Sequence, residues 1–141
     1  MYNLLNMISM EIWSILVYSG LVFVTILIQA TYSARTAGVA YGLSNHTESQ
    51  PNKGPAGKRI DNTLNNLKEG AVMYLPLAIL AVTLDVTNAW TYYAALATIL
   101  SRVLYVPTYI FGIEKLRSII FTPSLLAVPA MAVGIILGLL I

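Results

Sequence analysis

The chain of 141 residues has no cysteine, a single histidine and few charged side chains. Without cysteine it can form no disulfide, no thiolate metal site and no cysteine nucleophile. His46 lies alone in a polar segment and cannot build a zinc or haem site by itself, so we expect no bound metal. The formal net charge of +2 is too small to indicate binding to nucleic acid.

The sequence is rich in apolar residues: 57% of the residues are hydrophobic, and the mean hydropathy is +0.74. This composition predicts an all-α, multi-pass integral membrane protein with one domain over residues 1–141. Each apolar segment is long enough to cross about 30 Å of hydrocarbon at 1.5 Å per residue. We expect four spans, at residues 10–36, 59–84, 88–112 and 118–140. Residues 37–58, rich in Gly, Pro, Ser and Asn, should form an aqueous loop.

The first expected span carries polar or aromatic residues near both ends. Trp13 and Tyr18 are suited to anchor it at the membrane interface, and Glu11 should be hydrated at the same rim. At the opposite end, Arg35 can reach lipid headgroups or turn inward toward a neighbouring helix.

The second span begins with a polar stripe, since Arg59, Asn62, Asn66 and Glu69 follow one another at i, i+3, i+7 and i+10. At 3.6 residues per turn these four side chains share one helix face. Ionised groups are costly at membrane depth unless they face another helix or a wet cavity, so the stripe is a candidate site. The alternative is a helix start at the membrane surface with solvated charges.

A second stripe lies at the end of the third span, where Arg102, Tyr105 and Tyr109 occupy i, i+3 and i+7. One guanidinium and two phenol hydroxyls on one face can bind an anionic ligand. The alternative is an aromatic belt with an arginine that extends to the interface.

Every lysine and arginine falls on the side of the first and third connections, which predicts that this side is cytoplasmic and that both termini lie outside. The two polar stripes should then open to the same, cytoplasmic side. We therefore predict an anion-binding pocket between helices at this surface. The eight basic residues are Arg35, Lys53, Lys58, Arg59, Lys68, Arg102, Lys115 and Arg117.

These residues resemble the pattern of the MAPEG family, the membrane-associated proteins in eicosanoid and glutathione metabolism. The resemblance lies in R-x6-N-x2-E from Arg59 to Glu69, in R-x2-Y-x3-Y from Arg102 to Tyr109, and in the later Arg117. The run YVPTYIFGIEKLRS is similar to that of bacterial members. The layout of four spans and the chain length match as well.

The resemblance implies a homotrimer of four-helix protomers in the bacterial inner membrane, with glutathione bound between protomers on the cytoplasmic side. It implies that Arg35 reaches the tripeptide from a neighbouring protomer and that Arg117 stabilises the thiolate. The other implied glutathione-binding residues are Arg59, Asn66, Glu69, Arg102, Tyr105 and Tyr109. The chain departs from the pattern at Asn62, where many members carry a second arginine.

The leading hypothesis is a glutathione-dependent transferase or peroxidase that acts on hydrophobic electrophiles, with membrane lipids around it. The alternative is a non-catalytic protein that binds a lipid-like ligand or serves as an accessory subunit of a larger membrane complex. A small channel has little support, because the charged residues gather at one side of the membrane.

Overall fold

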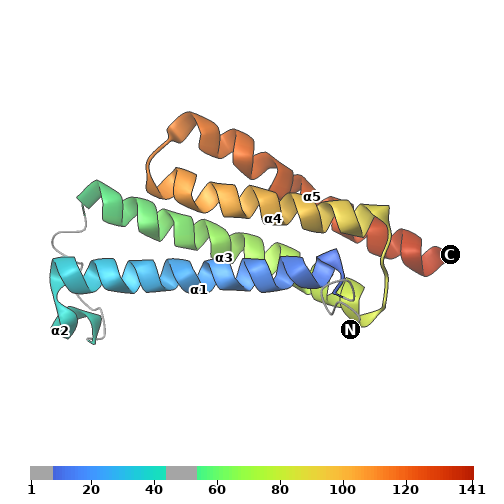
Figure 1. Cartoon of the computed structure of the whole chain (residues 1–141), viewed down its shortest axis with the longest axis horizontal. Coiled ribbons are helices and arrows are strands. Elements are labelled where there is room, and N and C mark those ends of the chain that lie inside the picture. Colours follow the sequence, from blue (N-terminus) through green and yellow to red (C-terminus); the bar gives the residue numbers. More distant parts are fainter. Residues whose placement is uncertain (1–7, 44–53) are drawn as a thin grey trace, which may run out of the picture.

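The computed structural model describes residues 8–43 and 54–141, and it consists of helices joined by short connections. The long helices are α1 (Met10–Ala37), α3 (Gly54–Thr83), α4 (Ala89–Ile110) and α5 (Glu114–Leu140). They lie alongside one another, and the short α2 (Val39–Gly42) turns away beyond the end of α1 (Figure 1).

Local sequence signals set the ends of the helices. Ser9 caps α1, because its Oγ accepts a hydrogen bond from the Ile12 amide at 3.4 Å. Asn88 and Thr91 form a capping box at the start of α4. Gly38 and Gly112 follow α1 and α4 with φ of 87° and 77°, values that favour glycine, so both helices end there.

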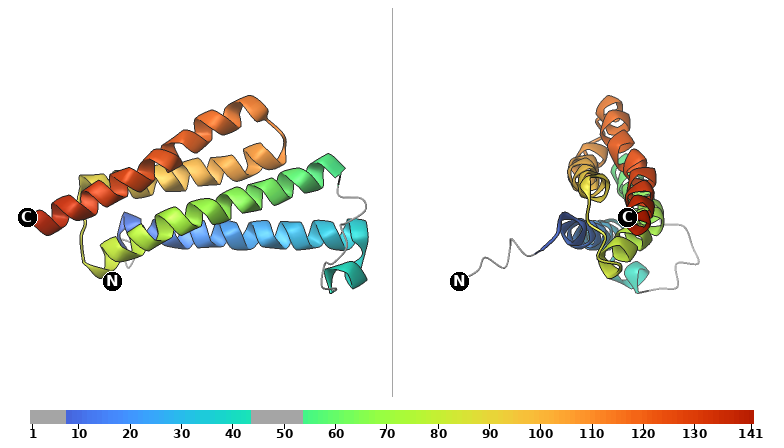
Figure 2. Two further views of the ribbon diagram at one scale, coloured as in Figure 1. Left: turned by 180° about the vertical axis from the view of Figure 1, so that it is seen from behind. Right: turned by 90° about the vertical axis from the view of Figure 1, so that its right-hand side faces the viewer.

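The helices pack as a bundle in which α5 lies mainly on α4, and α1 contacts both α3 and α4 (Figure 2). Alanines along the contacts allow the backbones to approach closely, and larger side chains fill the centre. Ser101 Oγ donates to the Ile120 carbonyl and so joins α4 to α5. The fully buried residues at the centre include Leu67, Tyr74, Ala78, Ala95 and Met131.

Two helices begin earlier than the hydropathy pattern predicts. Helix α3 starts at Gly54 instead of residue 59, and α5 starts at Glu114 instead of residue 118. Hydropathy detects only the apolar part of a helix, and a helix can begin with a polar turn that lies in water. Pro55 is tolerated in this first turn of α3 because a first-turn amide has no intrahelical acceptor. The expected loop at 37–58 is therefore helical at both of its ends, and residues 44–53 lie outside the described part.

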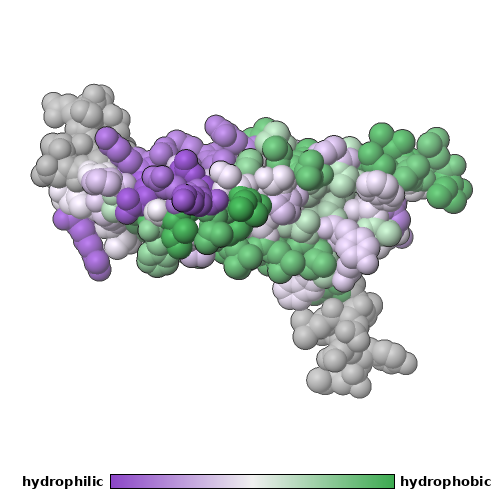
Figure 3. Space-filling view, turned by 90° about the horizontal axis from the view of Figure 1, so that it is seen from above, coloured by the Kyte–Doolittle hydropathy of each residue, from purple (hydrophilic) through white to green (hydrophobic). Residues whose placement is uncertain are grey.

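Within the described residues, α1, α4 and α5 are long and apolar enough to cross a membrane. The chain is therefore a membrane protein. Helix α3 is not among these three, because the first half of this 30-residue helix carries most of its charged and amide side chains. In Figure 3, hydrophilic residues gather toward one end of the face shown, and hydrophobic residues cover much of the rest.

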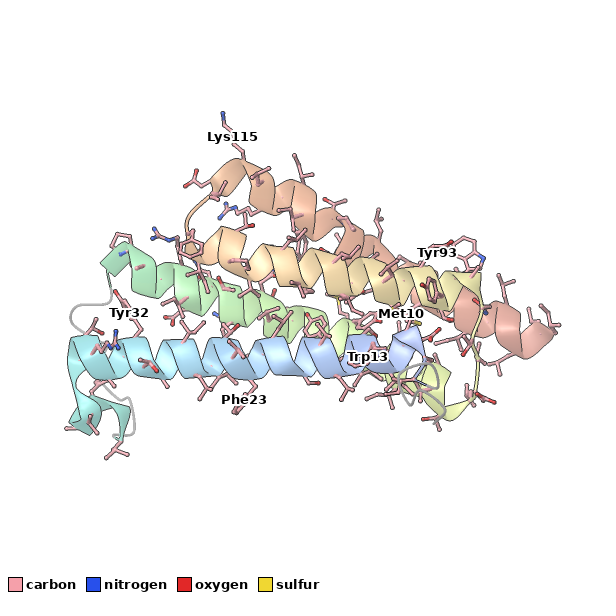
Figure 4. The ribbon with its side chains drawn as sticks, in the orientation of Figure 1. Met10, Trp13, Phe23, Tyr32, Tyr93 and Lys115 are labelled. Atoms are coloured by element: carbon pink, nitrogen blue, oxygen red, sulfur yellow. The ribbon has the colours of Figure 1, made fainter. Side chains whose placement is uncertain are left out.

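The two ends of the bundle differ in their side chains. Trp13 and Tyr93 lie at one end, and Lys115 lies at the other (Figure 4). Two expectations for the first end were wrong. Glu11 and Tyr18 are each only 1% exposed, because α1 turns this face toward α3 and α4 and not toward the interface.

Candidate functional site

Two neighbouring cavities lie where α3, α4 and α5 meet at the basic end of the bundle. The first, of about 220 Å³, lies between Asn66 on α3, Tyr105 on α4 and Phe121 on α5. The second, of about 290 Å³, is lined by Arg59 and by the turn between α4 and α5. Both cavities share the side chains of Asn62, Tyr109 and Arg117, so they form one composite site.

Aromatic contacts hold the cationic wall of this site. The Arg117 guanidinium carbon lies 5.1 Å from the centre of the Tyr109 ring. The Tyr109 and Tyr105 rings are 5.5 Å apart, and the Phe121 ring follows Tyr105 at 5.8 Å. A cation over a ring face is attracted by the negative face of the ring. This stack therefore holds the exposed Arg117, which lies in the first turn of α5, in the lining of both cavities.

The turn between α4 and α5 positions Arg59 in the lining of the second cavity. The Arg59 Nε donates to the Ile110 carbonyl at 3.1 Å, which satisfies a carbonyl at the end of α4. The Arg59 side chain passes over Gly112, the residue at which the positive φ ends the helix. A guanidinium has five N–H groups, so Arg59 keeps donors for a ligand after making this bond.

Arg102 lies behind the cavities, in the interior of the bundle, and it is only 3% exposed. Its Nη1 donates to the Asn66 Oδ1 at 2.7 Å, while its Nε has no hydrogen-bond partner among the described residues. The guanidinium carbon is 5.5 Å from the centre of the Tyr18 ring and 5.1 Å from that of Phe121. Arg102 therefore contacts the residues that line the first cavity without lining it.

The interior space that Arg102 occupies depends on a glycine. A Cβ atom at Gly70 would overlap the Arg102 Nη2 and the Tyr18 hydroxyl. That hydroxyl donates to the Leu67 carbonyl at 2.8 Å, so Tyr18 has little freedom to move away. Glycine on α3 thus makes room for a buried guanidinium beside the site.

Two residues of the expected site lie elsewhere on the protomer. Glu69 is exposed and lines neither cavity, although it shares a face of α3 with Asn62 and Asn66. Arg35 is exposed at the end of a separate groove of about 350 Å³ between α1 and α3. The other residues of that groove are Val24, Leu27, Ile28, Thr31, Tyr32 and Ile60.

Several residues of the site were not expected from the sequence. Phe121 and Ser118 line the first cavity, and Tyr18 supports Arg102 from the far side. A single sequence gives no signal for Tyr18, because α1 and α4 are far apart in the chain. Ser118 and Phe121 could have been predicted from the sequence, because they are three residues apart near the start of an apolar helix and follow Arg117 closely.

The charges of the composite site favour an anion. Lys58, Arg59 and Arg117 line the second cavity with one carboxylate, that of Glu114. Amides and tyrosine hydroxyls supply further hydrogen bonds. Within residues 8–43 and 54–141, no group of three His, Cys, Asp or Glu side chains could hold a metal ion. The described site can therefore bind a polar, net-anionic molecule through guanidinium groups.

A comparison with protein-family models matches residues 12–137 of the chain to the MAPEG family. This match includes all of α3 and α4 and most of α1 and α5. Searches of curated proteins and of solved structures returned no match.

Proposed function

Because the chain belongs to the MAPEG family, we propose that it is a membrane-bound, glutathione-dependent transferase or peroxidase acting on hydrophobic electrophiles. The observation that carries the proposal is the composite site, where Arg59, Asn62, Asn66, Tyr109 and Arg117 surround two joined cavities. Family membership supports a glutathione-related activity, and the charge of the site supports an anionic thiol.

The chemistry of glutathione suits these residues. Its two carboxylates pair well with the forked donors of Arg59, with Lys58 and with the tyrosine hydroxyls. A thiol has a reference pKa of about 8.5, and a nearby guanidinium stabilises the thiolate, which is the reactive form. We assign this role to Arg117, which is exposed and lines both cavities.

The reaction then needs no nucleophile from the protein. In a transfer reaction the glutathione sulfur forms a bond to the electrophilic carbon, the leaving group departs with its electron pair, and the thiol proton passes to solvent. With a hydroperoxide, the sulfur attacks the terminal oxygen, the O–O bond breaks and an alcohol leaves. A second glutathione then converts the sulfenic acid to glutathione disulfide and water.

We propose a homotrimer to account for the two expected residues that are exposed away from the cavities. Arg35 and Glu69 are exposed on the protomer, and an assembly could bring Arg35 of one copy to the site of the next. Glu69 would then pair with the γ-glutamyl ammonium. Native mass spectrometry in mild detergent tests this assembly, and detection of the monomer alone would contradict it.

We propose that α3 is the fourth span of the protomer, in keeping with the single domain expected over residues 1–141. At 1.5 Å per residue its 30 residues reach roughly 45 Å, and its second half is apolar. An assembly would cover its polar face. The bacterial inner membrane, with a cytoplasmic basic end, remains the proposed location.

A thiolate titration tests the role of Arg117. Addition of glutathione to the purified protein should give the ultraviolet absorbance of a thiolate, and Arg117→Ala should abolish this signal while some binding remains. Lys115→Ala is the matched control, because Lys115 is a cation two residues away that lines neither cavity. An unchanged signal in Arg117→Ala would contradict the assignment.

The alternative function, a non-catalytic lipid-binding protein or accessory subunit of a larger complex, is favoured by a different observation. An apolar groove of about 490 Å³ runs between α4 and α5 near Trp90, Tyr93 and Pro123. A lipid chain could occupy such a groove. Failure to conjugate a general electrophile such as chlorodinitrobenzene, together with tight retention of lipid, would favour this alternative.

A further inference from the structure

The direction of one hydrogen bond determines how Asn66 faces the site. Arg102 Nη1 is bonded to the Asn66 Oδ1 at 2.7 Å. A guanidinium carries only donors, so the amide must turn its oxygen, and not its nitrogen, toward Arg102. The planar amide then directs its NH₂ group away from Arg102, and the Asn66 side chain lines the first cavity.

The NH₂ group of Asn66 is available to donate hydrogen bonds to a ligand. No hydrogen bond from Asn66 Nδ2 is made within the described residues, although the side chain is only partly exposed. Arg117, which lines the same cavity, is also donor-only. The wall formed by Asn66 and Arg117 therefore offers hydrogens to whatever enters the cavity.

The packing around Arg102 restricts its movement, so that its hydrogen bond to Asn66 is not easily broken. Tyr18 and Phe121 contact its guanidinium at 5.5 and 5.1 Å from their ring centres. Gly70 leaves just enough room for it, and a side chain there would collide with it. Among residues 8–43 and 54–141, Arg102 has no hydrogen bond to a carboxylate. A buried charge without such a partner is destabilising, so an arginine would be an unfavourable choice if it only filled space.

We infer that Arg102 is a positioning and specificity-determining residue, which fixes the Asn66 amide as a hydrogen-bond donor and so makes the first cavity selective for a group that accepts hydrogen bonds. This inference deepens the proposed function, on which it rests for the identity of the ligand. It assigns a carboxylate of glutathione, and not the γ-glutamyl ammonium, to the position beside Asn66. Arg102 itself does not touch the ligand.

Asn66→Asp is the decisive variant, because aspartate has nearly the same shape as asparagine. The new carboxylate would still accept from Arg102, so the thermal unfolding temperature should be unchanged or raised. It would present an anionic oxygen to the cavity in place of the NH₂ group. The glutathione Kd from calorimetry on the detergent-solubilised protein should rise at least about tenfold. A Kd equal to that of the wild type would overturn the inference.

Two variants of Arg102 separate positioning from structure. Arg102→Met frees the amide to rotate, and the Kd should rise about tenfold. Arg102→Lys retains a donor to the Asn66 oxygen, and the Kd should return to within about threefold of the wild type. Unchanged binding in Arg102→Met would overturn the inference even if Asn66→Asp did not fold.

A second readout distinguishes failure of this inference from failure of the proposed function. With asparagine labelled by ¹⁵N, the side-chain NH₂ signal of Asn66 is identified by its loss in Asn66→Asp. If glutathione moves no signal, the glutathione proposal fails, and inorganic sulfate is added as a simple anion. Movement of the Asn66 signal with sulfate would support the donor wall. No movement of that signal with either anion would overturn the inference.

Discussion

At the scale of single residues, the site depends on cations that differ in burial. Arg117 and Arg35 are exposed, Arg59 is half-buried, and Arg102 is buried with one nitrogen unpaired within the described part of the chain. The sequence places all four arginines on polar stripes or at helix ends, but it does not show which of them are buried. How deeply each arginine is buried depends on how the helices pack together, and the packed residues are far apart in the sequence.

Gly70 gives a direct test of the space around Arg102. Gly70→Ala should destabilise the protein by about 1–3 kcal/mol, because the new methyl group overlaps Arg102 and Tyr18. The matched control is Gly20→Ala on α1, where, among the described residues and apart from the neighbouring helix backbone, no atom lies within 4 Å of the added Cβ. Alanine is favoured over glycine in a helix by roughly 0.5–1 kcal/mol, so this control should be stabilised. Thermal unfolding in detergent measures both, and equal effects would contradict the packing described.

At the scale of helices, the sequence predicted an all-α fold, which is confirmed, and a long helix of the structure overlaps each of the four predicted spans. That all four cross the membrane stays a prediction. Apolar segments of this length have few alternatives to helix in a membrane. The polar first turns of α3 and α5 were not predicted as helix, because hydropathy does not report capping or helix continuation. Glu11 and Tyr18 were placed at the interface because one sequence cannot show which face of α1 packs inward.

Asn88 connects the start of α4 to α5 in two ways. Its Oδ1 accepts from the amides of Trp90 and Thr91, and its Nδ2 donates to the Gly134 carbonyl at 2.7 Å. Asn88→Asp keeps the cap but loses the donor, and it should cost about 1 kcal/mol. Asn88→Ala loses both and should cost a further ~0.5–2 kcal/mol. Equal stability of the two variants in thermal unfolding would show that the cap contributes nothing.

At the scale of the whole molecule, the sequence predicted that the lysines and arginines gather at one end of the bundle. The structure brings Arg59, Asn66, Tyr105, Tyr109 and Arg117 together at the basic end. Their roles toward glutathione stay predictions. Arg35 and Glu69 could not be placed by reasoning about one chain, since the proposed contacts with them come from another copy.

The orientation in the membrane can be tested because the chain has no cysteine. Lys58 and Asp85 are exposed near opposite ends of α3. In intact cells, a membrane-impermeant thiol reagent should label Asp85→Cys and leave Lys58→Cys unlabelled, because basic connections stay in the cytoplasm. Labelling of both variants after the cells are broken is the control. Labelling of Lys58→Cys alone in intact cells would reverse the orientation.

The central claim is that glutathione binds in the composite site, and a structure of the assembled protein determined with millimolar glutathione tests it most directly. The account predicts density for the tripeptide in the two cavities, with its sulfur beside Arg117 and a carboxylate beside Asn66. It also predicts that Arg35 of a neighbouring protomer approaches the same density. Empty cavities at saturating glutathione, or density confined to another surface, would contradict the account.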